Sequence, residues 1–177
     1  MRLFYISLLL LLTSSLLAQN VTDKADSLLT IVKEKYSLQF PKSWTVDTSK
    51  LFGMDVLLRS PKTDSLDDFR ENMNLFVQNL HGMNYDLTRM GTESETQIKN
   101  MVTDVQIIES RLDSSSSLNH YILKYKGRQG KYYLITIQHY YLKDDIGYAL
   151  TMTIQEGKEQ DYIASANKIF NSFRLLQ

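Results

Sequence analysis

The sequence has no cysteine, no excess of charge of either sign and no glycine-rich phosphate loop. Without cysteine, the chain can form no disulfide framework, no thiolate zinc site, no cysteine nucleophile and no iron–sulfur cluster. Its 20 lysines and arginines balance 20 aspartates and glutamates, so no overall field attracts nucleic acid or an anionic membrane. None of the seven glycines repeats at P-loop or dinucleotide-binding spacing.

Motifs for hydrolysis are missing as well. The chain has neither a Gly-x-Ser-x-Gly nucleophile elbow nor a His-Glu-x-x-His zinc motif. What is present is the composition of an ordinary folded protein, with 43% apolar and 23% charged residues in a length of 177 that suits one domain. We therefore predict a protein that is not an enzyme, with no catalytic residues, no metal and no cofactor.

The first 18 residues, MRLFYISLLLLLTSSLLA, have the pattern of a secretory signal peptide. Arg2 lies beside the terminal amine, a leucine-rich run follows from Leu3, and small polar residues come before Ala18. An uncleaved anchor is the alternative, but the run is shorter than the roughly 20 apolar residues that span a bilayer. Since there is no cysteine to carry lipids, we predict an exported protein, periplasmic or extracellular, that is not lipid-anchored.

Cleavage after Ala18 leaves 159 residues (177 − 18) with a formal charge of −1 (19 − 20), because Arg2 is lost. We expect residues 19–34 to form a polar N-terminal segment and residues 35–177 a single domain without a transmembrane span. Within the first segment, residues 25–33 fit either a helix or a strand. Residues 36–40 alternate as a strand that Pro41 ends.

Hydrophobic periodicity divides the rest of the chain into strands and two helices. Alternation predicts strands over residues 54–59 and 72–80, and then a four-stranded meander over residues 105–112, 118–126, 131–143 and 147–155. Helical spacing predicts helices over residues 86–103 and 158–171. The fold class is therefore α+β, with a largely antiparallel β-sheet flanked by helices.

Two of these elements have distinctive features. The strand over residues 132–142 is apolar on both faces, which is typical of a central strand covered on both sides. The helix over residues 86–103 contains Thr92 and Glu95, which fit a capping box, and Gly91, which we expect to kink or interrupt the first turn.

Four short motifs occur in an order and spacing typical of one superfamily. They are YSLQFPKSW at residues 36–44, DFRENMNL at 68–75, YALTMT at 148–153 and NSFR at 171–174. Together they resemble the PsbP-like superfamily, including bacterial PsbP-related and DcrB-type secreted proteins. The resemblance spans residues 36–174, which is most of the mature chain.

The resemblance implies an α/β/α sandwich around an antiparallel sheet. It also implies an accessory or binding role, because members of this superfamily share no known set of catalytic residues. Plant photosystem members assist oxygen evolution, but the leader here is that of a secreted protein and nothing matches a photosystem-specific site. The resemblance therefore supports a fold more strongly than a function.

Acidic residues gather in the predicted loop between the second and third strands. Asp64, Asp67, Asp68 and Glu71 could suggest a calcium site, but they lack the alternating ligands, central glycine and distal glutamate of an EF-hand. We interpret them as part of a solvated loop in which the carboxylates lose little hydration.

Two histidines are the candidates for a metal site. If the strands over residues 118–126 and 131–143 pair through a turn at 127–130, His120 faces Ile137 and His139 faces Leu118. The two imidazoles are then diagonal neighbours on one face, with Met152 beside His139 and Cα atoms about 7–8 Å apart. A usable site needs a third ligand, so we favour two partly buried histidines and leave metal binding by His120 and His139 as the alternative.

The remaining candidate groups have structural interpretations. His81 is expected to be exposed in a loop, and the serine run at residues 114–117 has no evident base beside it. We expect the sheet tyrosines to pack in the core rather than to form a binding face: Tyr121, Tyr125, Tyr132, Tyr133, Tyr140, Tyr141 and Tyr148.

Our leading hypothesis is a non-catalytic secreted or periplasmic accessory protein that binds an unknown protein partner at the cell envelope. Nucleic acid is excluded as a partner, because basic residues flank one turn only and the chain is predicted to be exported. The alternative is a protein that binds a small ligand or a metal in a pocket between sheet and helix.

Overall fold

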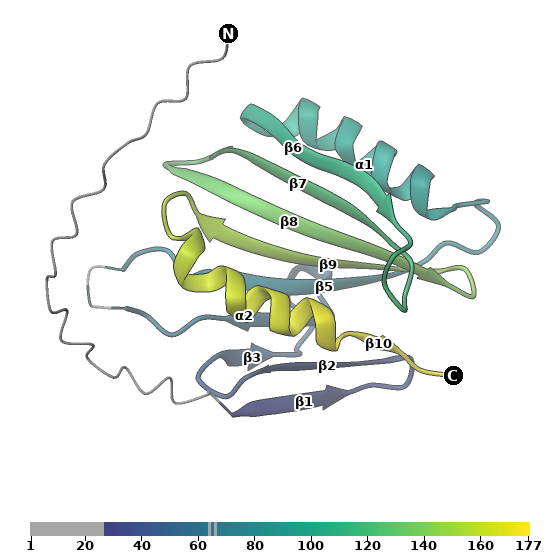
Figure 1. Cartoon of the computed structure of the whole chain (residues 1–177), viewed down its shortest axis with the longest axis horizontal. Coiled ribbons are helices and arrows are strands. Elements are labelled where there is room, and N and C mark those ends of the chain that lie inside the picture. The colour runs from purple at the N-terminus through teal and green to yellow at the C-terminus, as the bar shows by residue number, and fades with distance from the viewer. Residues whose placement is uncertain (1–26, 64, 66) are drawn as a thin grey trace, which may run out of the picture.

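The computed structural model describes residues 27–63, 65 and 67–177, so the predicted leader and Asp64 lie outside the described residues. The described chain contains two helices, α1 (Leu87–Met101) and α2 (Glu159–Ser172), and ten strands (Figure 1). The strands are β1 (Leu28–Val32), β2 (Tyr36–Pro41), β3 (Thr45–Asp47), β4 (Val56–Arg59), β5 (Asn72–Asn79), β6 (Thr103–Asp113), β7 (His120–Gln129), β8 (Tyr132–Lys143), β9 (Ile146–Gln155) and β10 (Arg174–Leu175).

The strands form two antiparallel sheets. Seven strands pair in the order β3-β4-β5-β9-β8-β7-β6, and three pair in the order β1-β2-β10. The predicted meander from β6 to β9 is confirmed, and β8 is an inner strand as its two apolar faces indicate. β5 pairs with β9 over its whole length, from Asn72↔Thr153 to Asn79↔Ile146.

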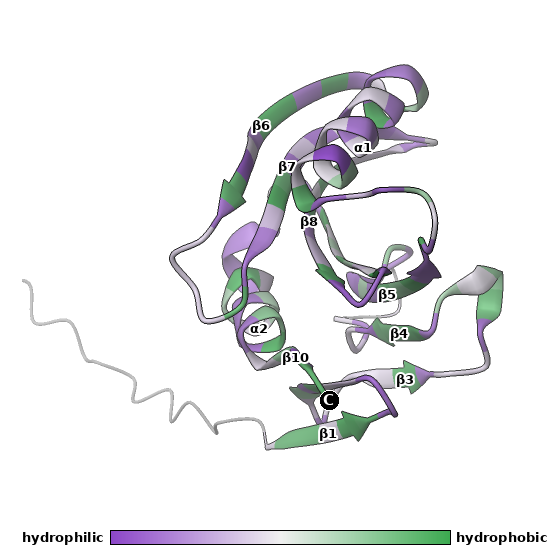
Figure 2. Cartoon of the chain, turned by 90° about the vertical axis from the view of Figure 1, so that its right-hand side faces the viewer, coloured by the Kyte–Doolittle hydropathy of each residue, from purple (hydrophilic) through white to green (hydrophobic). Residues whose placement is uncertain are grey.

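The two helices lie on opposite faces of the large sheet (Figure 2). Tyr121, Leu123 and Tyr140 pack beneath α1, whereas Tyr141 and Leu150 pack in the core beneath α2. Tyr140 and Tyr141 are neighbours in β8 and therefore point to opposite faces. The α+β class and the α/β/α arrangement are both confirmed.

The larger core lies between the sheet, α2 and the small sheet. Ala166 and Ile169 of α2 are fully buried, and Phe173 just after the helix is 1% exposed. Tyr36 of β2 stacks on Phe173 with ring centroids 5.9 Å apart. The apolar stripe predicted for the last helix is therefore its buried face.

The turn between β7 and β8 differs from the prediction. β7 continues through Gly127 to Gln129, and the connection is the two-residue turn Gly130–Lys131. A Cβ atom on Gly127 would lie 2.4 Å from Val102 Cγ1, so this glycine allows close packing of the strand and does not mark a turn. The register predicted for the two strands was therefore wrong by four residues, since His139 lies opposite Ile122 and not Leu118.

The helix α1 begins where the sequence predicts, but its capping residue differs from the prediction. Asp86 caps the helix, because its side chain accepts a 2.7 Å hydrogen bond from the backbone N–H of Arg89. Thr92 lies inside the helix and bonds back to the carbonyl of Thr88, so it is not a cap. Gly91 does not interrupt the helix; it lies against the ring of Tyr121, where a Cβ atom would come within 2.1 Å.

Among the described residues, no helix is long and apolar enough to cross a membrane.

Candidate functional site

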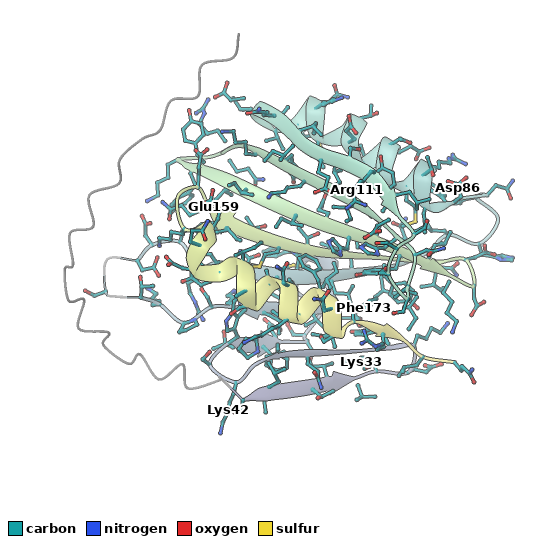
Figure 3. All side chains as sticks on the ribbon, in the orientation of Figure 1. Lys33, Lys42, Asp86, Arg111, Glu159 and Phe173 are labelled. Atoms are coloured by element: carbon teal, nitrogen blue, oxygen red, sulfur yellow. The ribbon has the colours of Figure 1, made fainter. Side chains whose placement is uncertain are left out.

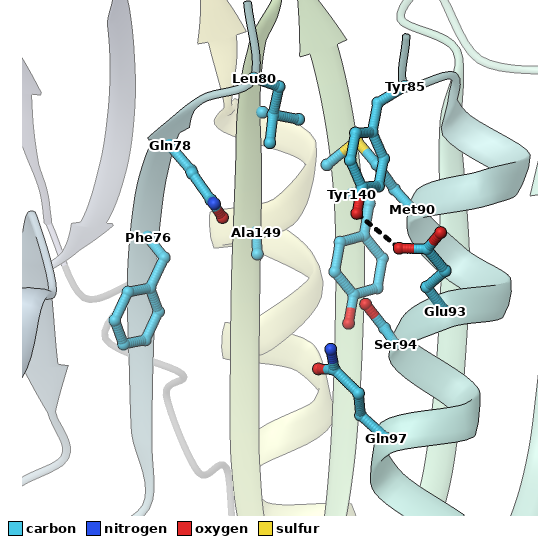
Figure 4. Close-up of a pocket in the computed structure, with 11 residues that line it drawn as sticks. Phe76, Gln78, Leu80, Tyr85, Met90, Glu93, Ser94, Gln97, Tyr140 and Ala149 are labelled. Carbon is cyan, nitrogen blue, oxygen red and sulfur yellow. Dashed lines mark hydrogen bonds between the residues drawn. The ribbon is translucent and has the colours of Figure 1, made fainter. Parts of the chain in front are cut away.

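A cavity of about 210 Å³ lies between α1 and the part of the sheet beside it (Figure 4). The helix packs mainly on β6, β7 and β8, which leaves the same face of β9 and β5 accessible. The cavity is lined by Phe76, Gln78, Leu80, Tyr85, Met90, Glu93, Ser94, Gln97, Tyr140, Gly147 and Ala149.

The floor of the cavity is apolar and made by small residues of β9. Gly147 is covered by Leu80 and Met90, because a Cβ atom on it would lie 2.8 Å from Leu80 Cδ1 and 2.9 Å from Met90 Cε. Ala149, on the same face of β9, is only half-buried. Phe76 of β5 stands beside this floor and remains 41% exposed. Phe76 and this floor together form a small accessible apolar surface.

The rim of the cavity is polar but uncharged over most of its length. Gln78 on β5 and Gln97 on α1 point in from opposite sides (Figure 4). Neither amide has a hydrogen-bond partner among the described residues. The phenol of Tyr140, which also lines the cavity, donates a 2.8 Å hydrogen bond to Oε1 of Gln138.

Glu93 is the carboxylate that lines the cavity, and its negative charge is balanced by a neighbouring arginine. Glu93 accepts a 2.5 Å hydrogen bond from the hydroxyl of Tyr85 and a 2.8 Å bond from Nε of Arg89. These bonds lower the pKa of Glu93, and the bond to Glu93 raises the pKa of Tyr85. Burial raises the pKa of Tyr140 to about 12. All three pKa shifts move away from pH 7, so none of these three groups is tuned to exchange a proton near neutral pH.

His120 and His139 lie together in a second cavity, of about 360 Å³, on the other face of the sheet. Phe173, which is labelled in Figure 3, lies in the lining of this cavity. The imidazoles are stacked with ring centroids 4.5 Å apart, so the prediction of two histidines side by side on one face is confirmed. Their strand partners were predicted wrongly: His139 lies opposite Ile122 on β7 and Leu150 on β9.

The geometry of the histidine pair gives no support to a shared metal ion. The ring planes are only 28° apart, so their in-plane lone pairs run nearly side by side and do not converge. His139 stacks on Phe170 at 4.0 Å on its other side. Within the described residues, no group of three or more His, Cys, Asp or Glu side chains could hold a metal.

The serine run does have a base beside it, contrary to the prediction. Ser116 Oγ lies 3.3 Å from Nδ1 of His120. That nitrogen is 2.9 Å from the carbonyl oxygen of Leu118, which can only accept, so Nδ1 must hold a proton. Ser116 donates its own proton to the same carbonyl at 2.7 Å. The imidazole therefore cannot activate this serine.

The acidic loop is less solvated than predicted. Glu71 is fully buried and Asp67 is 8% exposed, whereas Asp68 is exposed and pairs with Lys131. Lys158, at the start of α2, places Nζ 3.4 Å from Asp67 Oδ1 and 4.0 Å from Glu71 Oε1. The sequence prediction missed this burial because the lysine comes from a distant part of the chain.

The remaining predictions concern single residues. His81 is exposed as expected, with Nδ1 3.1 Å from Asp145 Oδ2. Tyr133 is 50% exposed, but most of the sheet tyrosines are in the core as expected: Tyr121, Tyr125, Tyr140, Tyr141 and Tyr148.

No residue of the cavity under α1 was singled out from the sequence as a site residue. Two signals were present: Phe76 lies on the polar face of β5 with Gln78, and Glu93 and Gln97 are one turn apart on α1. Neither signal shows that helix and strand meet, because that depends on the packing of α1 across the sheet.

No family model matches the chain, and no curated protein matches it in sequence. Solved structures do match its fold. Cyanobacterial PsbP (CyanoP) from Synechocystis sp. PCC 6803 superposes with a TM-score of 0.60 at 13% identity, covering 85% of this chain and 94% of that one. LpqN of Mycobacterium tuberculosis, described as involved in cell envelope biogenesis, superposes with a TM-score of 0.60 at 9% identity, covering 91% and 97%.

The Ran-binding protein Mog1p of Saccharomyces cerevisiae is a third match, with a TM-score of 0.56 at 9% identity over 85% of this chain and 96% of that one. The chain therefore has the PsbP-like fold, as its motifs indicate. At these identities the likeness establishes the fold alone, and the DcrB-type assignment stays a prediction.

Proposed function

We propose that this protein is a non-catalytic accessory protein of the cell envelope, which is exported and binds a protein partner. The observation that carries the proposal is the cavity under α1, which offers an apolar floor and unpartnered amides but no acid–base pair. Such a surface can hold a ligand but cannot transfer its protons.

The comparisons support this proposal in a general way. One protein of this fold is described as involved in cell envelope biogenesis and another as Ran-binding. The sequence adds residues 1–18, whose pattern is that of a secretory signal peptide and supports export. The domain at residues 35–177 is proposed as the binding module.

Export and partner binding can be tested in one preparation. The full chain, tagged after Gln177, is produced in its source cells and captured after chemical crosslinking. We expect a mature chain that begins at Gln19, recovered outside the cytoplasm with one recurrent protein adduct. A cytoplasmic chain that retains residues 1–18, or repeated capture of no adduct, would contradict the proposal.

A small ligand in the cavity is the second candidate function. The unpartnered amides of Gln78 and Gln97 favour it, since they could orient a neutral polar molecule above the apolar floor. A ligand that binds only the folded state raises the melting temperature. Thermal-shift screening with neutral metabolites should then give a stabilising compound whose effect is lost in Gln97→Ala.

A further inference from the structure

We infer that the partner enters the cavity under α1 as an extended, uncharged polypeptide segment, which places one large apolar side chain on the floor of the cavity. This inference rests on the proposed function and names the partner chemistry for that site. It follows from the size of the cavity, the apolar surface beside it, the two free amides and the local charge.

The size of the cavity suits a single side chain. Its volume of about 210 Å³ is below the roughly 300–1,000 Å³ of pockets that hold drug-sized molecules and cofactors. Protein interfaces, in contrast, commonly centre on one anchor side chain inserted into a small desolvated pocket. Ala149, which is only half-buried, provides the floor on which such a side chain can lie.

Apolar surface continues outside the cavity, beyond Phe76. The turn Leu51–Gly53 adjoins that ring, because a Cβ atom on Gly53 would lie 3.8 Å from Phe76 Cε1. In this turn Phe52 is 84% exposed, with φ at 52°, and Lys50 before it has φ at 63°. A left-handed backbone is rare for a bulky residue and is kept mainly at functional surfaces. An extended segment that passes over Phe76 continues past this turn and could contact Phe52 as well.

The two free amides match a peptide backbone. Each side-chain amide offers both a donor and an acceptor. Gln78 and Gln97 stand on opposite sides of the cavity, on β5 and on α1. An extended segment lying between them presents alternating N–H and C=O groups, so both amides can be satisfied without any charged group.

The local charge favours an uncharged segment. Glu93 is the only acidic or basic residue that lines the cavity within the described chain. Its carboxylate is already bonded to Arg89 and Tyr85. A lysine of the partner would therefore have to compete with Arg89, and an acidic residue would meet Glu93 without a free cation.

The inference can be tested with a displayed library of random 12-residue peptides, selected against the mature protein purified from cells that produce the full chain. We expect enriched peptides with one large apolar residue flanked by uncharged residues. Binding of a synthetic enriched peptide should weaken at least tenfold in Phe76→Ser and in Gln97→Ala. Tyr133→Ser is the matched control: Tyr133 is an exposed aromatic on the other face of β8, and its loss should leave the affinity unchanged.

Both substitutions in the cavity change exposed side chains, so the variants should fold, and equal melting temperatures confirm it. The inference is overturned if no peptide is enriched, if enriched peptides bind through charged residues, or if Phe76→Ser and Gln97→Ala bind as the unchanged protein does. A change in oligomeric state caused by Phe76→Ser would also overturn it, because the surface would then hold a second copy. If cellular capture still recovers a partner with Phe76→Ser, the inference fails while the proposed function stands.

Discussion

At the scale of single residues, titratable side chains in the two cavities are held by their neighbours. His120 has its Nδ1 proton directed at a carbonyl, and Glu93 is held by an arginine and a tyrosine. The histidine pair could be predicted because alternation places both residues on one face. Its chemistry could not, since ring stacking and the Leu118 carbonyl depend on the loop before β7.

His139 should make the protein less stable in mild acid. Burial, with the nearby His120 adding to it, lowers the pKa of His139 from 6.5 to about 3. Below about pH 6.5 the unfolded chain therefore binds one more proton than the folded chain, and the free energy of unfolding falls as the pH falls. We expect a loss of about 2 kcal/mol between pH 7 and pH 5, measured by urea unfolding.

His139→Gln should remove most of this pH dependence, whatever its effect on stability at pH 7. His81→Gln replaces an exposed histidine and should leave the pH dependence as it is. The carboxylates with lowered pKa, such as Asp113, act mainly below about pH 4 and do not affect this range. An equal slope in the protein and in His139→Gln would show that the imidazole is not desolvated.

Gly91 should be intolerant of even one methyl group. Alanine normally stabilises a helix interior by about 1 kcal/mol relative to glycine. Here its Cβ would lie 2.1 Å from the ring of Tyr121, so we expect Gly91→Ala to destabilise the protein by about 1–3 kcal/mol. In a Tyr121→Val background the same change should become neutral or stabilising. Chemical unfolding of the four proteins measures this coupling.

At the scale of elements, local signals were sufficient where neighbours in sequence are also neighbours in space. Alternation predicted β5 and the meander, and helical spacing predicted α2, because each pattern repeats within one segment. Predicted turns and helix breaks were wrong where a glycine instead allows close packing between elements. Gly127 and Gly91 look like a turn and a helix break, but both are sites of close packing.

The true start of α1 can be tested by comparing two substitutions. Asp86→Ala removes the side chain that accepts from the N–H of Arg89, and we expect it to cost about 1 kcal/mol of unfolding free energy. Thr92→Ala should change stability by less than about 0.5 kcal/mol, because Thr92 is inside the helix and exposed. The opposite order would mean that Thr92, which fits a capping box in the sequence, caps the helix instead of Asp86.

At the scale of the whole molecule, the candidate site is a product of long-range packing. The cavity exists because α1 lies on β6, β7 and β8 while β5 reaches its place by pairing with β9. Neither contact leaves a local pattern, so the fold class could be predicted while the site could not. The motifs pointed to the PsbP-like fold because their aromatic residues, such as Tyr36 and Phe173, form its larger core.

The central claim is that the cavity under α1 holds a protein partner, and site-specific photocrosslinking in cells tests it most directly. A photoreactive residue is placed at Gln78, beside the cavity, or at Lys168, an exposed position on α2. We expect one discrete protein adduct from position 78 and little or none from position 168. An adduct that forms at position 168 but not at position 78, or at neither position, would contradict the claim.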